Sequence, residues 1–203
     1  MIDSSATISE FLLAAAAKQP TPGGGAVTAL AGALAASMGA MVLAYSVGKK
    51  DLAAHSPANQ QALHELSAAG EMLQRLMIED QQAFEALTDG KKRGLPDDEL
   101  SRLTEICARV PQTIGATALA ILEVANRIVS TSNKWLLSDL AVCGELAAAT
   151  VRCSQHSVLV NLPEIRDERL RESLRADADK MVRRAVEQIS RLIPAIRVIQ
   201  DGK

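Results

Sequence analysis

Four groups of polar residues in this 203-residue sequence have types and positions that suit chemistry, and the first is a glycine run. Gly23, Gly24 and Gly25 stand directly before a long apolar segment. If that segment is a helix, the run exposes backbone N–H groups at the positive end of the helix dipole, where anions bind. A tight turn that needs a positive φ explains the glycines equally well. The run is not a nucleotide-binding loop, because no strand precedes it and the GxxxxGKS pattern is missing.

The second group is a pair of lysines, Lys49 and Lys50, directly after the apolar segment. Such a pair either binds an anionic ligand or caps the last carbonyl groups of a helix in solvent. Residue type alone leaves both interpretations open.

The third group is a single acid, Asp80, on a stripe of apolar residues spaced by three and four positions. A carboxyl group partly withdrawn from water holds its proton more tightly, which suits general acid/base catalysis. The alternative is an acid at the edge of the stripe that reaches solvent or pairs with an arginine.

The fourth group surrounds a polar break between two apolar segments and contains Asn133, Ser138 and Asp139. Helix capping explains Ser138 and Asp139 as well as a binding role does. The three histidines and three cysteines form no zinc, disulfide or Cys–His pattern, and no Ser–His–Asp arrangement follows from spacing. The residues by themselves therefore predict a helical protein with a polar pocket.

Helices must position these groups, because aromatic residues make up only 2% of the chain and alanine and leucine dominate its apolar positions. We expect one all-α domain over residues 1–203, an up-and-down helical bundle without repeats or linkers. The predicted helices cover residues 9–18, 23–46, 58–88, 98–129, 138–152 and 167–200. We expect an exposed loop over 89–98, a possible kink at Pro111, a bend at Pro194 and extended backbone over 157–162.

The segment from Gly23 to Gly48 has no charged residue and is long enough to span a bilayer. Alanine, glycine, serine and threonine supply little transfer energy, so we predict a central helix buried on all sides and no membrane association. Small residues recur along it every four positions, namely Gly32, Ala36 and Ala40, and Ala35 and Gly39. Such lines let neighbouring backbones approach closely, within one subunit or across a dimer.

The formal net charge of −2 and the scarcity of aromatic residues argue against a nucleic-acid partner. The odd number of widely spaced cysteines predicts a reducing, cytoplasmic environment and no tightly bound metal or cofactor. The acidic, weakly apolar N-terminus is unlike a secretory signal.

The same residues resemble the formiminotetrahydrofolate cyclodeaminase and methenyltetrahydrofolate cyclohydrolase family. The resemblance rests on motifs in the family's order over nearly the whole chain. They are PTPGGGAV at 20–27, GKK at 48–50, D-x-x-A-F from Asp80, V-P at 110–111, N-x-x-x-x-S-D-x-x-V from Asn133, and V-x-x-N-L at 158–162.

The resemblance implies an all-helical homodimer that binds a tetrahydrofolate in a cleft. Thr21, the three glycines, Lys49, Lys50, Asn133, Ser138 and Asn161 would line that cleft. Asp139 would be the carboxylate beside the one-carbon bridge, Asp80 would orient the pterin or share the proton transfer, and Lys49 would polarise an oxygen or bind a glutamate carboxylate. Cyclohydrolysis of the methenyl bridge is the expected reaction, and cyclodeamination of a formimino group is the alternative.

Three positions depart from the family pattern. Ser132 stands where the family has glycine, Ser157 where it has asparagine, and Asp97 where it has lysine after Leu-Pro. Because these positions lie near the expected pocket, a non-catalytic helical dimer that binds folate or a partner protein is a further alternative.

Overall fold

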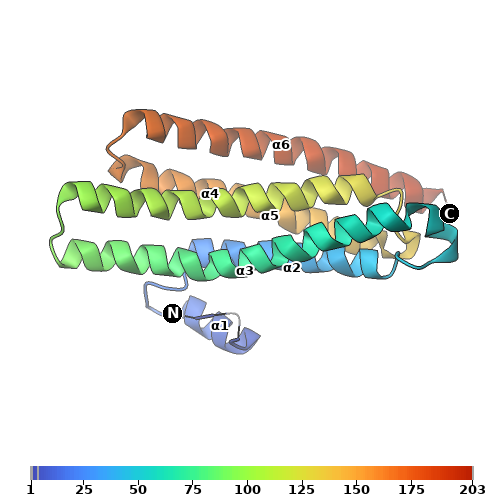
Figure 1. The fold of residues 1–203 in the computed structure, drawn as a ribbon, viewed down its shortest axis with the longest axis horizontal. Helices are drawn as coiled ribbons and strands as arrows, with labels where there is room; N and C mark the ends of the chain where they lie inside the picture. Colours follow the sequence, from blue (N-terminus) through green and yellow to red (C-terminus); the bar gives the residue numbers. More distant parts are fainter. Residues whose placement is uncertain (1, 4, 203) are drawn as a thin grey trace.

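The computed structural model describes residues 2, 3 and 5–202, and these residues contain helices and no strand. This confirms the all-α prediction. Figure 1 shows six α-helices joined by short turns, some of which are 3₁₀ helical. Their bounds are α1 Ile8–Ala16, α2 Gly24–Ala44, α3 Ser56–Lys92, α4 Asp97–Ile128, α5 Leu137–Asn161 and α6 Glu168–Asp201, with 3₁₀ turns η1 Lys50–His55, η2 Lys134–Leu136 and η3 Leu162–Glu164.

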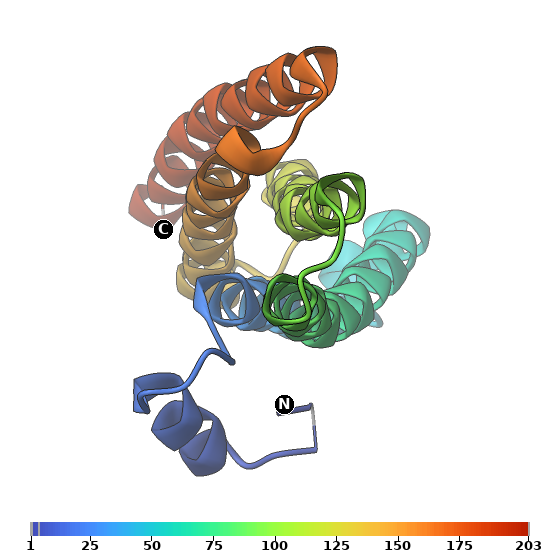
Figure 2. The same cartoon turned by 90° about the vertical axis from the view of Figure 1, so that its left-hand side faces the viewer.

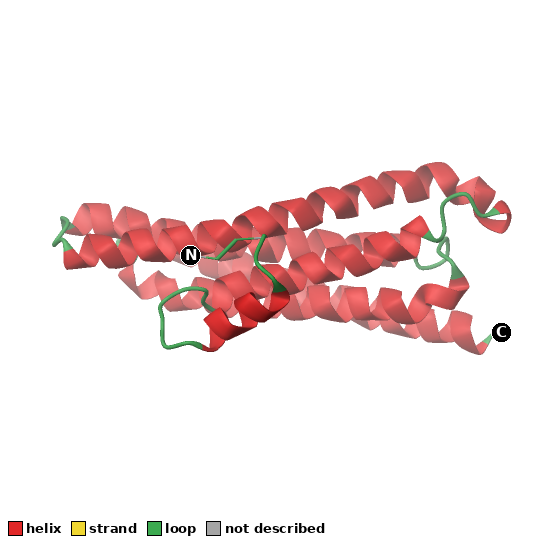
Figure 3. Cartoon of the chain, turned by 90° about the horizontal axis from the view of Figure 1, so that it is seen from below, coloured by secondary structure: helices red, strands yellow, loops and turns green. Residues whose placement is uncertain are grey.

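Helices α2 to α5 form the core of an up-and-down bundle. Helix α2 packs against α3 and α5, and α4 packs against the same two helices, which closes a ring of four. Helix α6 covers α5 and α4 from outside, and α1 lies outside the bundle on the side of α2, as the end-on view shows (Figure 2). The connections between the long helices gather at the two ends of the bundle (Figure 3).

Helix α2 is held closely between α3 and α5 through its small residues. A Cβ added at Gly32 would lie 3.1 Å from side-chain atoms of both Leu73 on α3 and Thr150 on α5. At Gly39 it would lie 2.9 Å from Leu66 on α3 and 3.0 Å from Cys143 on α5. The predicted lines of small residues therefore serve close helix packing within the subunit.

The prediction that this helix is buried on all sides is wrong. Val27, Leu34 and Tyr45 are 44%, 53% and 62% exposed, and they follow one another along a single face of the segment. Helix α2 is long and apolar enough to cross a membrane, and 56% of its most apolar window is buried inside the protein. One uncharged face of α2 thus remains at the surface of the subunit.

Two segments predicted as irregular are helical. Residues 157–161 continue α5, because Val158 and Leu162 are buried at a spacing of four while Val160 is 73% exposed. Alternating apolar residues over so short a run fit either a strand or a helix. Here the burial of two residues four positions apart shows that the segment is helical. Helix α3 likewise continues to Lys92, so the predicted 89–98 loop shrinks to the turn between α3 and α4.

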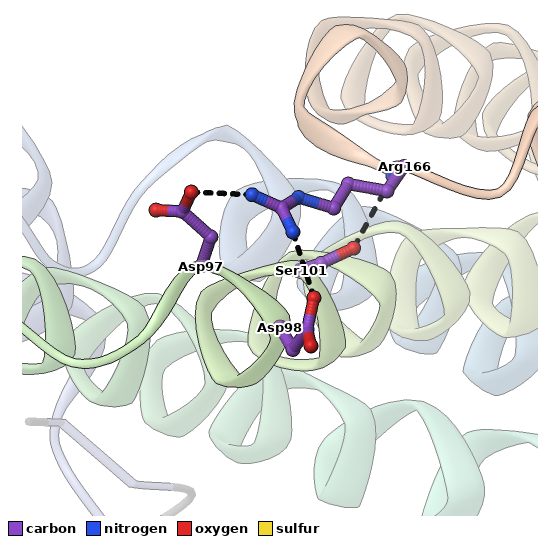
Figure 4. Close-up of polar contacts among 4 residues, drawn as sticks. All are labelled: Asp97, Asp98, Ser101 and Arg166. Atoms are coloured by element: carbon purple, nitrogen blue, oxygen red, sulfur yellow. Dashed lines mark hydrogen bonds and ion pairs between the residues drawn. The ribbon is translucent and has the colours of Figure 1, made fainter.

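Charged residues join the helical hairpins at one end of the bundle (Figure 4). The Arg166 guanidinium lies between Asp97 and Asp98, 2.7 Å from an Asp98 oxygen, and the Arg166 backbone N–H donates to Ser101 Oγ at 3.2 Å. These ion pairs are half-exposed or more, so each contributes at most about 1 kcal/mol. Asp97, which replaces the lysine of the resembled family, therefore holds the α5–α6 connection against α4.

Candidate functional site

The predicted site residues fall into two groups at opposite ends of the bundle. One group lines a cavity of about 350 Å³ at the start of α2 and the end of α5, and the other lies at the end of α2 and the start of α5. Helix α2 has 21 residues, so the two ends are about 30 Å apart along it. The first group contains Thr21, Gly23, Gly24, Gly25, Asp80 and Asn161, and the second contains Lys49, Lys50, Asn133, Ser138 and Asp139.

Close contact explains the third glycine of the run. Gly23 is the N-cap of α2, and Gly24 and Gly25 open its first turn. A Cβ at Gly25 would overlap the carboxyl carbon and both carboxyl oxygens of Asp80. The alternative of a turn with positive φ is wrong, because among the described residues only Gly48 and Gly94 have positive φ. Gly25 is needed because a carboxyl group of α3 rests on the backbone of α2.

Asp80 is the acid of this cavity. Its half-buried carboxyl group accepts a hydrogen bond from the backbone N–H of Ala26 in the first turn of α2. Burial raises the pKa of Asp80, and the Ala26 hydrogen bond offsets only part of that rise. No ion pair of the described residues includes Asp80, so the predicted alternative of an arginine partner is not observed. A carboxyl group with a raised pKa in a cavity is suited to exchange a proton with a ligand.

The loop before α2 is fastened to α3 next to Asp80. Thr21 is buried, and its hydroxyl donates to Glu85 Oε1 at 2.7 Å. The Thr21 hydroxyl therefore fixes the loop to α3, the helix that carries Asp80, at a position five residues after that acid. This bond keeps the glycine run and the acid in register.

Asn161 closes the opposite wall of the cavity from the end of α5. Its amide Nδ2 donates to the Cys107 carbonyl at 3.0 Å and to the Ser157 carbonyl at 2.8 Å. The first bond joins α5 to α4, so the carboxamide is fixed between two helices.

Sequence reasoning assigned no binding role to six of the lining residues, and three of these omissions follow from one wrong assignment. His156, Ser157, Val160 and Asn161 line the cavity together because residues 156–161 are helical. Residues one, four and five positions after His156 lie on the same helix face as His156. The prediction of extended backbone for this segment therefore did not group them. The other lining residues that carried no predicted binding role are Phe84, Cys107 and Pro20.

The Cys107 thiol is not a nucleophile of this cavity. Burial, together with the neighbouring Asp80 charge, raises the pKa of Cys107 to about 11. The thiol therefore stays protonated at neutral pH. Among the described residues no group of His, Cys, Asp and Glu side chains is arranged to hold a metal ion.

The second end of the bundle is also polar. The Asn133 backbone N–H donates to Ser46 Oγ at 2.8 Å, and the Asn133 side chain caps η2 by accepting from the Trp135 N–H at 3.3 Å. Lys49 lies directly before η1 and Lys50 begins it. Ser138 and Asp139 lie within the first turn of α5, which has no side-chain cap, so the capping alternative for them is wrong.

Comparison with known proteins gives concordant matches over the chain. The family model described as formiminotransferase-cyclodeaminase matches residues 7–180. A methenyltetrahydrofolate cyclohydrolase of Methylorubrum extorquens is 27% identical over 90% of this chain and 95% of its own length. The crystal structure of a formiminotetrahydrofolate cyclodeaminase from Thermotoga maritima superimposes with a TM-score of 0.91 at 26% identity, covering 96% of this chain and 97% of that one.

Longer relatives contain this unit as one part. The formimidoyltransferase-cyclodeaminases of Gallus gallus and Rattus norvegicus are 25% and 23% identical. The alignments cover 88% and 97% of this chain but only 34% and 38% of those proteins. The present chain therefore spans about a third of their length.

The contact between Gly25 and Asp80 gives a prediction about stability. Substituting Gly25→Ala should lower the free energy of unfolding by about 1–3 kcal/mol, because the new methyl group must displace the carboxyl group from the first turn of α2. Gly24→Ala is the matched control, since a Cβ there meets nothing within 4 Å. Urea denaturation of both variants checks this. Equal losses at the two positions would contradict the assigned contact.

The raised pKa of Asp80 gives a prediction about pH. The acid binds its proton more tightly in the folded protein than in the unfolded chain, so its stabilising contribution is full at low pH and is lost as pH rises through the folded pKa. The free energy of unfolding of Asp80→Asn, relative to the unsubstituted protein, should therefore increase from about pH 3 to about pH 7. Denaturation curves at each pH measure it, and a decrease over that range would refute the assigned direction.

Proposed function

Because this chain belongs to the formiminotransferase-cyclodeaminase family, we propose that it is a methenyltetrahydrofolate cyclohydrolase of one-carbon metabolism. The reaction adds water to 5,10-methenyltetrahydrofolate and gives 10-formyltetrahydrofolate. End-to-end similarity to the Methylorubrum extorquens cyclohydrolase supports this choice. The observation that carries it is the Asp80 carboxyl group, which has no ion-pair partner among the described residues and rests on the glycine turn inside a cavity.

The proposed chemistry needs one group that accepts and returns a proton. The oxygen of water bonds to the cationic carbon between N5 and N10, and one proton of that water passes to the Asp80 carboxylate. The bond from this carbon to N5 then breaks, N5 takes the proton from Asp80, and the new hydroxyl loses its proton to solvent as the formyl carbonyl forms. A carboxylate also stabilises the cationic substrate, and the raised pKa of Asp80 suits both proton transfers.

Cyclodeamination is the second candidate, and the Thermotoga maritima structure favours it. In that reaction N10 attacks the 5-formimino carbon and ammonia leaves, which again moves one proton near a cationic carbon. The absorbance of methenyl-folate separates the two candidates. In cyclohydrolysis, the enzyme makes the absorbance of methenyl-folate fall. In cyclodeamination, the absorbance rises when formimino-folate is the substrate. If the protein only binds folate, the absorbance changes no faster than without protein.

Removing the acid gives the first activity prediction. Asp80→Asn should lower kcat by about 10²- to 10⁴-fold, because the amide cannot accept the proton of water. Asp89→Asn, an exposed acid of the same helix, is the control and should leave turnover unchanged. A loss under tenfold in the first variant, followed through methenyl-folate absorbance, would show that Asp80 does not transfer the proton.

We propose further that the enzyme is a homodimer in which each site uses both ends of the bundle. The exposed face of α2 supports this, since Val27, Leu34 and Tyr45 leave an uncharged surface uncovered in one subunit. If two copies pack this face antiparallel about a two-fold axis, the start of α2 in one copy meets the end of α2 in the other. Asp139, Asn133 and Lys49 of one copy would then complete the cavity of the other, with Asp139 beside the bridge.

A mixed dimer tests this arrangement. Co-expressed Asp80→Asn and Asp139→Ala chains, purified as heterodimers through two different tags, should recover about half of the unsubstituted turnover, since one of two equivalent sites is intact. The control pair, Asp80→Asn with Asp80→Ala, removes the acid from both cavities and should stay inactive. Failure to capture a heterodimer, or an inactive first pair when the unsubstituted enzyme is active, would refute the shared site.

We propose the cytoplasm as the location, with tetrahydrofolate as substrate and no resident cofactor. All three cysteines are free, and two of them are buried, which suits a reducing compartment.

A further inference from the structure

Pro111 lies inside α4, and the helix continues through it without interruption. Proline has no backbone N–H, so the carbonyl four residues earlier, that of Cys107, lacks its helical hydrogen-bond donor. Cys107 and Pro111 are both buried, so solvent does not readily replace that donor. A buried carbonyl without a partner is costly, and native structures normally supply one.

Asn161 supplies the missing donor from another helix. Its Nδ2 lies 3.0 Å from the Cys107 carbonyl and 2.8 Å from the Ser157 carbonyl. Both neighbours are carbonyl oxygens, which only accept, so the amide nitrogen must face them. The orientation of the carboxamide is thereby fixed, and its oxygen Oδ1 points away from both carbonyls.

We propose that Pro111 is a positioning residue, which leaves the Cys107 carbonyl open so that Asn161 is locked with Oδ1 toward the cavity as a hydrogen-bond acceptor. Asn161 lines that cavity together with Asp80. The two side chains then present acceptors from opposite walls, one neutral and one acidic. A cavity with this pattern selects a ligand that carries N–H donors.

This inference rests on the proposed function for the identity of that ligand. The pterin ring of tetrahydrofolate carries an amino group and a ring N–H on one edge, and a fixed amide oxygen accepts from such groups. Asn161 then sets the orientation of the ring, while Asp80 handles the proton. Asn161 therefore determines binding rather than the rate of the chemical step.

Restoring the backbone donor tests the role of Pro111. In Pro111→Ala the new N–H competes for the Cys107 carbonyl, so Asn161 loses one of its two anchors. We expect KM for methenyl-folate to rise about tenfold with kcat changed less than about twofold, while the melting temperature stays equal or rises. Pro194→Ala is the matched control, because Pro194 also lies inside a helix but the residue four positions before it, Ser190, is exposed and does not line the cavity. A purely structural role would instead lower the melting temperature and leave KM unchanged.

A second measurement does not depend on activity. In protein labelled with ¹⁵N at asparagine, the Asn161 carboxamide protons should exchange slowly with solvent, and more rapidly in Pro111→Ala but not in Pro194→Ala. Asn161→Asp, which cannot donate to either carbonyl, should raise KM as well and show no further rise when combined with Pro111→Ala. Exchange unaffected by Pro111→Ala, or additive effects in the double variant, would overturn the proposal. If the unsubstituted protein turned over no folate, the proposed function would fail while the exchange data still decided this inference.

Discussion

The structure depends on how closely a helix without bulky side chains can approach its neighbours. Helix α2 presents Gly25, Gly32 and Gly39 to the interior, and at each of these a methyl group would press against a side chain of α3 or α5. Close approach brings many atoms within van der Waals contact and compensates for the small apolar area of alanine and glycine. The close contact also fixes the position of α2 along the axis of α3, and so determines which residue of α3 contacts the first turn of α2. That residue is Asp80.

The cavity follows from this arrangement at the end of the bundle. The helix dipole and the Ala26 N–H favour a carboxylate at the start of α2, while burial disfavours its charge. The two effects oppose each other, and burial is the larger, so the pKa of the acid is raised. Across the cavity, the end of α5 is joined to α4 by Asn161, and the Arg166 ion pairs hold the following connection. Three helix ends are thus fixed around one acid.

Much of the fold was accessible from the sequence, because long amphipathic stripes and low aromatic content favour helices over other classes. The all-α class and the six helices agree with expectation. Four residues to which we assigned site roles, Thr21, Gly25, Asp80 and Asn161, line one cavity. Three kinds of information were not local in the sequence. The sequence does not distinguish the exposed face of α2 from its buried faces, because both consist of small or apolar residues. Whether Val158 to Leu162 formed a strand or a helix turn depended on which neighbours buried them. Which of the predicted site residues share one end of the bundle likewise follows only from the antiparallel packing of α2 and α5.

The three thiols of this protein differ sharply in their surroundings, and this has a practical consequence. Burial raises the pKa of Cys107 to about 11 and that of Cys143 to about 12, whereas Cys153 is exposed on α5. Maleimides and similar reagents attack thiolates that solvent can reach. The native protein therefore offers one position for chemical labelling, less than one helix turn before His156 on the cavity wall. A fluorophore attached there would report on events at the cavity without any cysteine having to be introduced or removed.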